Sequence, residues 1–170
     1  MYRDLEKFNR LASFGRELLH RPSIAEGLPM IAEYAVELLD CDRCSVFVYD
    51  EKRNRLWTEI SDGVDRIDID ADKGLAGAAL KSKDAIVVNS PYEDRRFLQK
   101  IDEETGYLTQ NILALVVFDA FRHPIGVLQF LNKKNEVEFN DKDVELATFF
   151  NHYISTYLQM AKLLEEQKNE

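Results

Sequence analysis

The sequence predicts an α+β fold, an α/β sandwich built on a mainly antiparallel sheet. Apolar residues recur at three-and-four spacing near both ends of the chain, which is the period of amphipathic helices. Between the ends, short apolar runs alternate with polar turns, as is typical of strands joined in hairpins. A polar stretch over residues 89–111 is too long for an ordinary loop in a compact domain. We therefore expect long helices on one face of the sheet, and short helices with a lid on the other.

Two helices are expected before the first strand. Ser23, followed three positions later by Glu26, has the pattern of a capping box, so a helix should begin there and run to Leu39. The preceding helix, over residues 2–20, should end at the Arg21-Pro22 pair because proline cannot continue it. Its apolar positions are Leu5, Phe8, Leu11, Ala12, Leu18 and Leu19.

The middle of the chain is expected to form strands and short helices. Residues 43–49 and 56–61 should pair as a hairpin across a polar turn. Residues 112–118 are apolar on both faces, which predicts a central strand. Between them we expect a strand over 66–70, a brief helix from Gly74 to Lys81 or Ser82, a strand over 85–88, and a helix over 97–105 stopped by Gly106.

The last strand, which begins near Gly126, is apolar on both faces apart from one amide. Leu128 and Phe130 fall on one face, while Gln129 falls on the other, between Val127 and Leu131. A buried amide needs hydrogen-bond partners. Gln129 is therefore either a ligand contact or bonded to neighbouring backbone.

The start of the C-terminal helix, over residues 141–166, is marked by its capping residues. Asn140 suits the N-cap position and Asp143 the N3 position, while Phe139 and Val144 have the spacing of a hydrophobic staple. An apolar stripe continues to the end of this helix, farther than a sheet of ordinary strands extends. The stripe is either intramolecular core throughout or, as we expect for the part beyond about residue 150, a dimer interface.

Composition and charge exclude several function classes. A length of 170 residues suits one domain, with an N-terminal helix over 1–20, a core over 23–140 and a C-terminal helix over 141–166. The formal net charge of −9 argues against a nucleic-acid partner. There is neither an apolar run of about 18 residues nor a signal-peptide core, so we expect a cytoplasmic protein without a membrane partner.

The two cysteines, Cys41 and Cys44, have the C-x-x-C spacing of redox pairs and half zinc sites. No second pair or histidine cluster lies near them in the sequence. We interpret them as buried core thiols and expect no metal site.

Several blocks of the sequence together resemble a GAF domain. The subgroup they are most similar to occurs in mammalian cyclic-nucleotide phosphodiesterases and cyanobacterial adenylyl cyclases. Its N-K…F-x-x-x-D-E signature is matched by Asn132, Lys133, Phe139 and Asp143, with Val144 in place of the last Glu. The resemblance covers roughly residues 24–158. It rests on CSVFVYD at 44–50, SDG at 61–63, ADKGLAG at 71–77, DEETGYLTQNIL at 102–113 and GVLQFLNK at 126–133.

The resemblance implies a GAF/PAS-like, six-stranded sheet and a homodimer formed through the N- and C-terminal helices. It implies a regulatory domain that binds a small molecule and is not itself an enzyme, with an output signalling domain elsewhere in the parent protein. No cofactor is required. The ligand is a cyclic nucleotide (cAMP or cGMP) or another small molecule, because a fold alone does not fix it.

Carried over position by position, the resemblance implies a ligand site between the sheet and the lid. In this interpretation Lys133 and Asp143 pair with each other and stabilise the corner between strand and helix. The implied ligand contacts are Ser45 and Asp62, the backbone N–H groups of Leu75 and Ala76 at a helix start, Asp102, Thr105 and Thr109 from the lid, and Gln129 from the floor.

This sequence departs from the subgroup at three site positions. The aromatic that stacks on the base is Ser61 here, an aromatic of the lid is Leu98, and a carboxylate of the floor is Gln129. Asp102 and Thr105 also have a second interpretation, as residues that terminate the lid helix.

Two other functions stay open at this point. One is a dimerisation module with no ligand. The other is a thiol-dependent free methionine sulfoxide reductase, which the position of both cysteines at the start of one strand disfavours.

Overall fold

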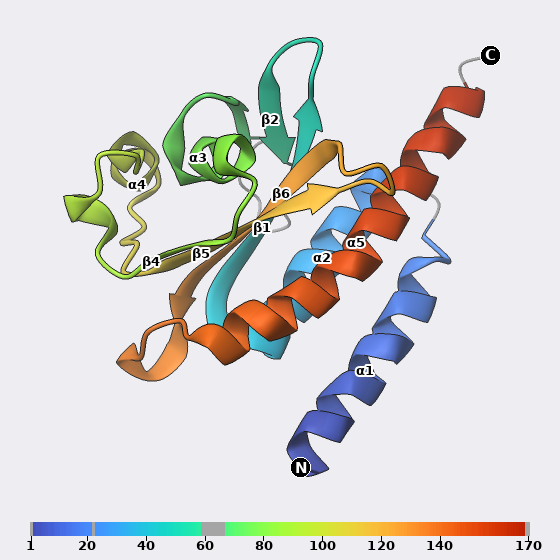
Figure 1. Ribbon diagram of the computed structural model, residues 1–170, viewed down its shortest axis with the longest axis horizontal. Helices are drawn as coiled ribbons and strands as arrows, with labels where there is room; N and C mark the ends of the chain where they lie inside the picture. Colours follow the sequence, from blue (N-terminus) through green and yellow to red (C-terminus); the bar gives the residue numbers. More distant parts are fainter. Residues whose placement is uncertain (1, 22, 59–66, 169–170) are drawn as a thin grey trace.

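The computed structural model describes residues 2–21, 23–58 and 67–168, and it confirms the predicted α+β fold (Figure 1). Six strands form one antiparallel sheet in the order β3-β2-β1-β6-β5-β4. The strands are β1 (Cys41–Asp50), β2 (Arg55–Thr58), β3 (Ile67–Asp70), β4 (Ile86–Val88), β5 (Ile112–Phe118) and β6 (Pro124–Lys133).

Five α-helices and two short 3-10 helices complete the described part of the chain. The helices α1, α2 and α5 lie on one side of the sheet, and α3 and α4 on the other (Figure 1). Their bounds are α1 (Tyr2–Leu18), α2 (Ile24–Leu39), α3 (Gly74–Ser82), η1 (Pro91–Glu93), α4 (Gln99–Thr105), η2 (Lys134–Glu136) and α5 (Asp141–Lys168).

The register between the two central strands brings polar residues together on the sheet. Ser45 of β1 lies directly opposite Gln129 of β6. On its other edge, β1 pairs with β2 only from Val48 to Asp50. Residues 41–47 therefore have no strand partner on that edge within the described chain. This unpaired edge borders the cavity described below.

The long helices and one face of the sheet enclose the larger hydrophobic core. The N-cap predicted for α2 is present, since the Oγ atom of Ser23 accepts a hydrogen bond from the backbone N–H of Glu26 at 3.2 Å. Gly126 allows β6 to approach β1 closely, because a Cβ atom there would lie 2.4 Å from the carbonyl oxygen of Phe47. Fully buried side chains of this core include Leu28, Ile31, Leu128, Phe130, Phe150, Ile154 and Tyr157.

The opposite face of the sheet carries a smaller core under α3. Leu75, Ala76 and Ala79 of this helix are buried against Phe47 and Val127 of the central strands. α4 ends at Gly106, whose φ of 73° is the left-handed conformation that glycine adopts readily. The lid predicted from the polar stretch is thus formed by η1, α4 and their connections.

Several details differ from the sequence-based expectations. Several strand and helix boundaries shift by one or two residues, and neither 3-10 helix was expected. The predicted end of the strand over 56–61 lies outside the described residues. Four apolar residues of the terminal helical stripes are exposed, namely Leu5, Phe8, Leu19 and Leu164, and the last of these lies in the part of α5 that was expected to form a dimer interface. Residues 59–66, which include Ser61 and Asp62, lie outside the described residues. Within the described chain, no helix is long and apolar enough to cross a membrane.

Candidate ligand-binding cavity

A cavity of about 610 Å³ is lined by the lid face of the sheet, by α3 and α4, and also by Leu28, Ala32, Glu33 and Val36 of α2. This volume is within the range of ordinary ligand pockets, which is roughly 300–1,000 Å³. The cavity brings together, from separate parts of the chain, the predicted residues Ser45, Leu75, Ala76, Leu98, Asp102, Thr105, Thr109 and Gln129.

The floor of the cavity presents two polar side chains without partners. Gln129 and Ser45 are each half-buried. Among the described residues, neither the amide of Gln129 nor the hydroxyl of Ser45 has a hydrogen-bond partner. The amide therefore remains able to donate and to accept a hydrogen bond, and the hydroxyl likewise. The sequence left two interpretations of Gln129, a ligand contact or a hydrogen bond to neighbouring backbone. The structure shows no hydrogen bond from its amide to the described backbone.

One wall of the cavity is the N-terminal end of α3. Gly74 begins this helix with a φ of 73°, and no side chain caps the first turn. Leu75 and Ala76, whose N–H groups lie in that turn, line the cavity. Backbone N–H groups at a helix start carry a partial positive charge and have no partner within the helix. This wall is suited to an anionic group of a ligand.

The polar atoms of Asp102 and Thr105 are committed to the lid itself. The carboxylate of Asp102, only 8% exposed, accepts hydrogen bonds from the backbone N–H of Thr109 at 2.8 Å and its hydroxyl at 2.9 Å. It accepts a third from the hydroxyl of Tyr92 at 2.6 Å. Thr105 donates its hydroxyl hydrogen to the carbonyl of Ile101 at 2.8 Å. These residues shape the wall but offer fewer free groups to a ligand than expected.

A cluster that was not predicted from the sequence lies at the rim of the cavity. The hydroxyl of Tyr107 donates to the carboxylate of Asp42 at 2.7 Å and accepts from the amide of Asn132 at 3.0 Å. Burial, and then the bond to Asp42, raises the pKa of Tyr107. The guanidinium carbon of Arg43 lies 3.9 Å from the centre of the Tyr107 ring. Arg43 precedes Ser45 by two residues, so strand periodicity could have identified it.

The signature residues tie the end of β6 to its neighbours. Asn132 accepts hydrogen bonds from the backbone of Gln110 at 2.6 Å and Asn111 at 3.3 Å, and donates to the carbonyl of Leu108 at 2.8 Å. Its φ of 58° turns the chain at this point. The end of β6 is thereby fixed to the segment that follows the lid helix.

The ion pair predicted between Lys133 and Asp143 is present. The Nζ atom of Lys133 lies 2.7 Å from the carboxylate of Asp143 and 2.5 Å from the carbonyl oxygen of Leu39. The same carboxylate accepts a hydrogen bond from the backbone N–H of Asn140 at 3.0 Å. Phe139 is buried beside them. One ammonium group thus joins the C-terminus of α2 to the N-terminus of α5.

The cysteines have neither the geometry nor the electrostatics of a redox pair. Cys41 and Cys44 lie on the extended strand β1, so their Cα atoms are about 10 Å apart at roughly 3.3 Å per residue. A disulfide requires less than about 7 Å. Burial raises the pKa of Cys41 to about 12, and also raises that of Cys44. Thiols in this state are poor nucleophiles, which argues against thiol-dependent catalysis.

This fold, one six-stranded antiparallel sheet with helices on both faces and a lid over one of them, defines a class of α+β domain. The GAF-domain family model matches residues 23–158 of the chain, and the chain therefore belongs to the GAF family.

Known proteins similar to this chain include cyclic-nucleotide phosphodiesterases. The chain is 28% identical to the probable 3',5'-cyclic phosphodiesterase pde-5 of Caenorhabditis elegans over 98% of its own length, but spans 25% of that protein. It is 35% identical to the cGMP-specific 3',5'-cyclic phosphodiesterase of Drosophila melanogaster over 57% of its own length and 9% of the relative. The chain thus spans a quarter or less of these relatives.

A solved structure confirms the fold. The GAF domain of a phosphoenolpyruvate-protein phosphotransferase from Coxiella burnetii superposes with a TM-score of 0.81 at 14% identity, covering 94% of this chain and 96% of the other. At this level of identity the likeness concerns the fold alone.

Proposed function

We propose that this chain is the ligand-sensing regulatory domain of a signalling protein, and that a cyclic nucleotide binds between its sheet and lid. The observation that carries this proposal is the cavity of about 610 Å³ with the unpaired amide of Gln129 on its floor. A cavity of this size lined by unpaired polar groups is best accounted for by a small polar ligand.

The two polar surfaces of the cavity match the two ends of a cyclic nucleotide. The N-terminus of α3 suits the cyclic phosphate, while Gln129 and Ser45 suit the edge of a base. An amide can present either a donor or an acceptor, so Gln129 alone does not discriminate between adenine and guanine. The Drosophila melanogaster relative, named as a cGMP-specific phosphodiesterase, makes cGMP the first candidate, ahead of cAMP.

A thermal-shift experiment tests this proposal. The protein is first freed of co-purified small molecules by unfolding and refolding, and then heated with cGMP, cAMP or AMP. A ligand of micromolar affinity at millimolar concentration should raise the free energy of unfolding by about 4 kcal/mol, or several degrees for a domain of this size. If neither cyclic nucleotide shifts the melting temperature, another small metabolite must be sought.

Gln129→Met separates binding from folding. Methionine has a similar volume and removes the amide, which has no partner among the described residues. We expect the free energy of unfolding without ligand to stay within about 0.5 kcal/mol or to rise, and the cGMP-induced shift to fall by more than half. Gln159→Met is the control, because Gln159 bonds Ser155 within α5 and does not line the cavity. A ligand shift unchanged in Gln129→Met would contradict the proposed floor contact.

The proposal includes a homodimer formed through α1 and α5 and an output domain in the parent protein. The greater length of the phosphodiesterase relatives supports the output domain. The support for a dimer is the set of exposed apolar side chains on these helices, namely Leu5, Phe8, Leu19, Phe149, Met160, Leu163 and Leu164. The same residues favour the second candidate, a dimerisation module without a ligand. For such a module, deletion of the terminal helices should leave monomers with no ligand response to lose.

A further inference from the structure

The tyrosine of the η1 segment occupies a place in the lid that the proposed ligand contacts do not explain. Tyr92 lies on the outer side of the lid, 42% exposed, and its hydroxyl reaches inward to the buried carboxylate of Asp102. That bond, at 2.6 Å, is as short as bonds from hydroxyl groups to carboxylates become. Tyr92 itself does not line the cavity.

Asp102 connects three segments that are separate in the chain. It belongs to α4, accepts from Tyr92 of η1, and accepts twice from Thr109, which precedes β5. Since Asp102 is only 8% exposed, water has little access to its carboxylate, and these hydrogen bonds satisfy the carboxylate oxygens instead. The three donors therefore hold α4 between η1 and the sheet.

The part of the lid held in this way forms a wall of the cavity. Phe97, whose ring lies 5.3 Å from that of Tyr92 in an edge-on arrangement, lines the cavity together with Leu98 and Ile101. Leu98 also lies against the start of α3, since a Cβ atom on Gly74 would be 3.1 Å from its Cδ1 atom. A movement of α4 away from Thr109 would remove this wall.

We propose that Tyr92, through its hydrogen bond to Asp102, is the latch that holds the lid closed and sets how long a ligand is retained in the cavity. The ligand part of this inference rests on the proposed function. Tyr92 acts as a positioning residue, because it touches the lid and not the ligand. Losing a hydrogen bond to a charged group changes an equilibrium by about 10–100-fold. We expect the lower end of this range, since two donors from Thr109 remain.

The test compares Tyr92→Phe, which removes one hydroxyl, with a matched variant. The hydroxyl of Tyr34 is buried without a hydrogen-bond partner in the described structure, so Tyr34→Phe makes the same chemical change between α1 and α2 without breaking a bond. Hydrogen exchange is measured in both variants and in the unaltered protein without ligand. We expect amides of residues 97–109 to exchange about tenfold faster in Tyr92→Phe alone, while those of β5 and β6 keep their rates.

Dissociation of fluorescently labelled cGMP from the same proteins gives a second readout. We expect it to be about tenfold faster from Tyr92→Phe and unchanged in Tyr34→Phe. Unchanged exchange in residues 97–109 would overturn the latch, and faster exchange with unchanged dissociation would overturn its role in retaining ligand. If the unaltered protein binds no cGMP, the cyclic-nucleotide proposal fails, and hydrogen exchange alone decides whether the latch exists.

Thr109→Val serves as a second variant, because it removes the other side-chain donor to Asp102. If the latch exists, amides of residues 97–109 should exchange faster in Thr109→Val, as they do in Tyr92→Phe. Slower or unchanged exchange would count against it.

Discussion

Single polar residues in this domain differ in whether other groups of the protein satisfy their hydrogen-bonding atoms. Asp102 has all its hydrogen bonds within the lid, and Asn132 has its bonds within the segment before β5. Gln129 and Ser45, on the same sheet, have none among the described residues. Both kinds are polar residues in an apolar setting, so their sequence alone does not distinguish them. Their energetic roles differ, because the first kind contributes to folding and the second is available for binding.

The cysteines give a prediction about pH. Because folding raises the pKa of Cys41 from its ordinary value of 9.0 to about 12, the folded chain keeps a proton that the unfolded chain loses between these values. This contribution to stability is complete below pH 9 and declines as the pH rises toward 12. We expect urea unfolding midpoints to fall between pH 9 and 10.5, and to fall less in Cys41→Ala when each protein is compared with its own midpoint at pH 8.

The same pKa shift predicts the reactivity of the thiols. At pH 8, iodoacetamide should modify the folded protein at least tenfold more slowly than the urea-unfolded chain, because the thiolate is the reactive form. Rapid modification of the folded protein would contradict the shift and would reopen thiol-dependent catalysis.

At the residue scale, sequence predicted which positions surround the cavity better than it predicted what their atoms do. The alternation along β6 correctly placed Gln129 on the lid face. The bonds of Asp102 were not predictable, because its partners Tyr92 and Thr109 lie 10 and 7 positions away in irregular chain. Arg43 was missed because it lies outside the recognised blocks, although strand periodicity places it beside Ser45. Tyr107 lies within the block at 102–113 but was not identified as a site residue.

At the scale of helices and strands, local signals were sufficient wherever the element was long or capped. Ser23, Gly106 and Asn140 each mark a helix boundary that the structure contains. Both 3-10 helices escaped prediction, since a single turn has no measurable periodicity. The spacing of Leu5 and Phe8 indicated an apolar face but not whether a partner covers it, and the structure leaves both side chains exposed.

The corner between β6 and α5 gives a prediction at this scale. Lys133→Met removes the ammonium group that joins Asp143 to the carbonyl of Leu39. The carboxylate of Asp143 is then left largely buried without its cation, so we expect the free energy of unfolding to fall by about 3 kcal/mol. Urea denaturation measures this difference.

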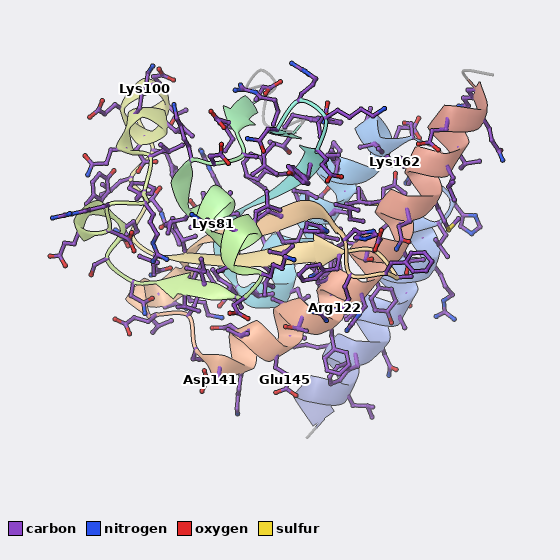
Figure 2. All side chains as sticks on the ribbon, turned by 45° about the horizontal axis from the view of Figure 1, so that its top comes forward. Lys81, Lys100, Arg122, Asp141, Glu145 and Lys162 are labelled. Atoms are coloured by element: carbon purple, nitrogen blue, oxygen red, sulfur yellow. The ribbon has the colours of Figure 1, made fainter. Side chains whose placement is uncertain are left out.

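The matched control is Lys100→Met, which breaks the ion pair with Glu104 on α4. Figure 2 shows Lys100 on the outer side of that helix, and its side chain is 82% exposed. Such a pair contributes less than about 0.5 kcal/mol. Equal losses in the two variants would mean that the corner is not held by this ion pair.

At the scale of the whole molecule, the contacts provide a connected route from the cavity to the terminal helices. Thr109 of the lid is followed by Gln110 and Asn111, which bond Asn132, and the adjacent Lys133 bonds both α2 and α5. Connectivity does not by itself transmit a signal. A ligand shifts the helices only if it binds two of their arrangements with different affinity. The relevant arrangements are those of α1 and α5 in a dimer.

The dimer itself is the last prediction. The exposed apolar side chains of α5 include Leu163, 60% exposed near the C-terminal end, with Met160 and Leu164 beside it on the helix. In a parallel or antiparallel pair of helices, this stripe would be buried, and one charge placed in it would oppose association. We therefore expect the unaltered chain to sediment as a dimer and Leu163→Glu to shift it toward monomer by at least tenfold in dissociation constant.

Leu108→Glu is the control for this change, because Leu108 is also 60% exposed but lies on the segment after α4, on the lid side of the sheet. Leu108→Glu should leave sedimentation unchanged. If added charge alone weakened the dimer, this variant would shift toward monomer as well. Circular dichroism establishes that both variants remain folded, which is expected since neither side chain belongs to the hydrophobic core.

A monomeric unaltered chain at micromolar concentration would remove the route through α5, because no second helix would then be present to respond. A dimer that survives Leu163→Glu would place the interface on another surface, and the exposed residues of α1, led by Leu5 and Phe8, would be the next to substitute.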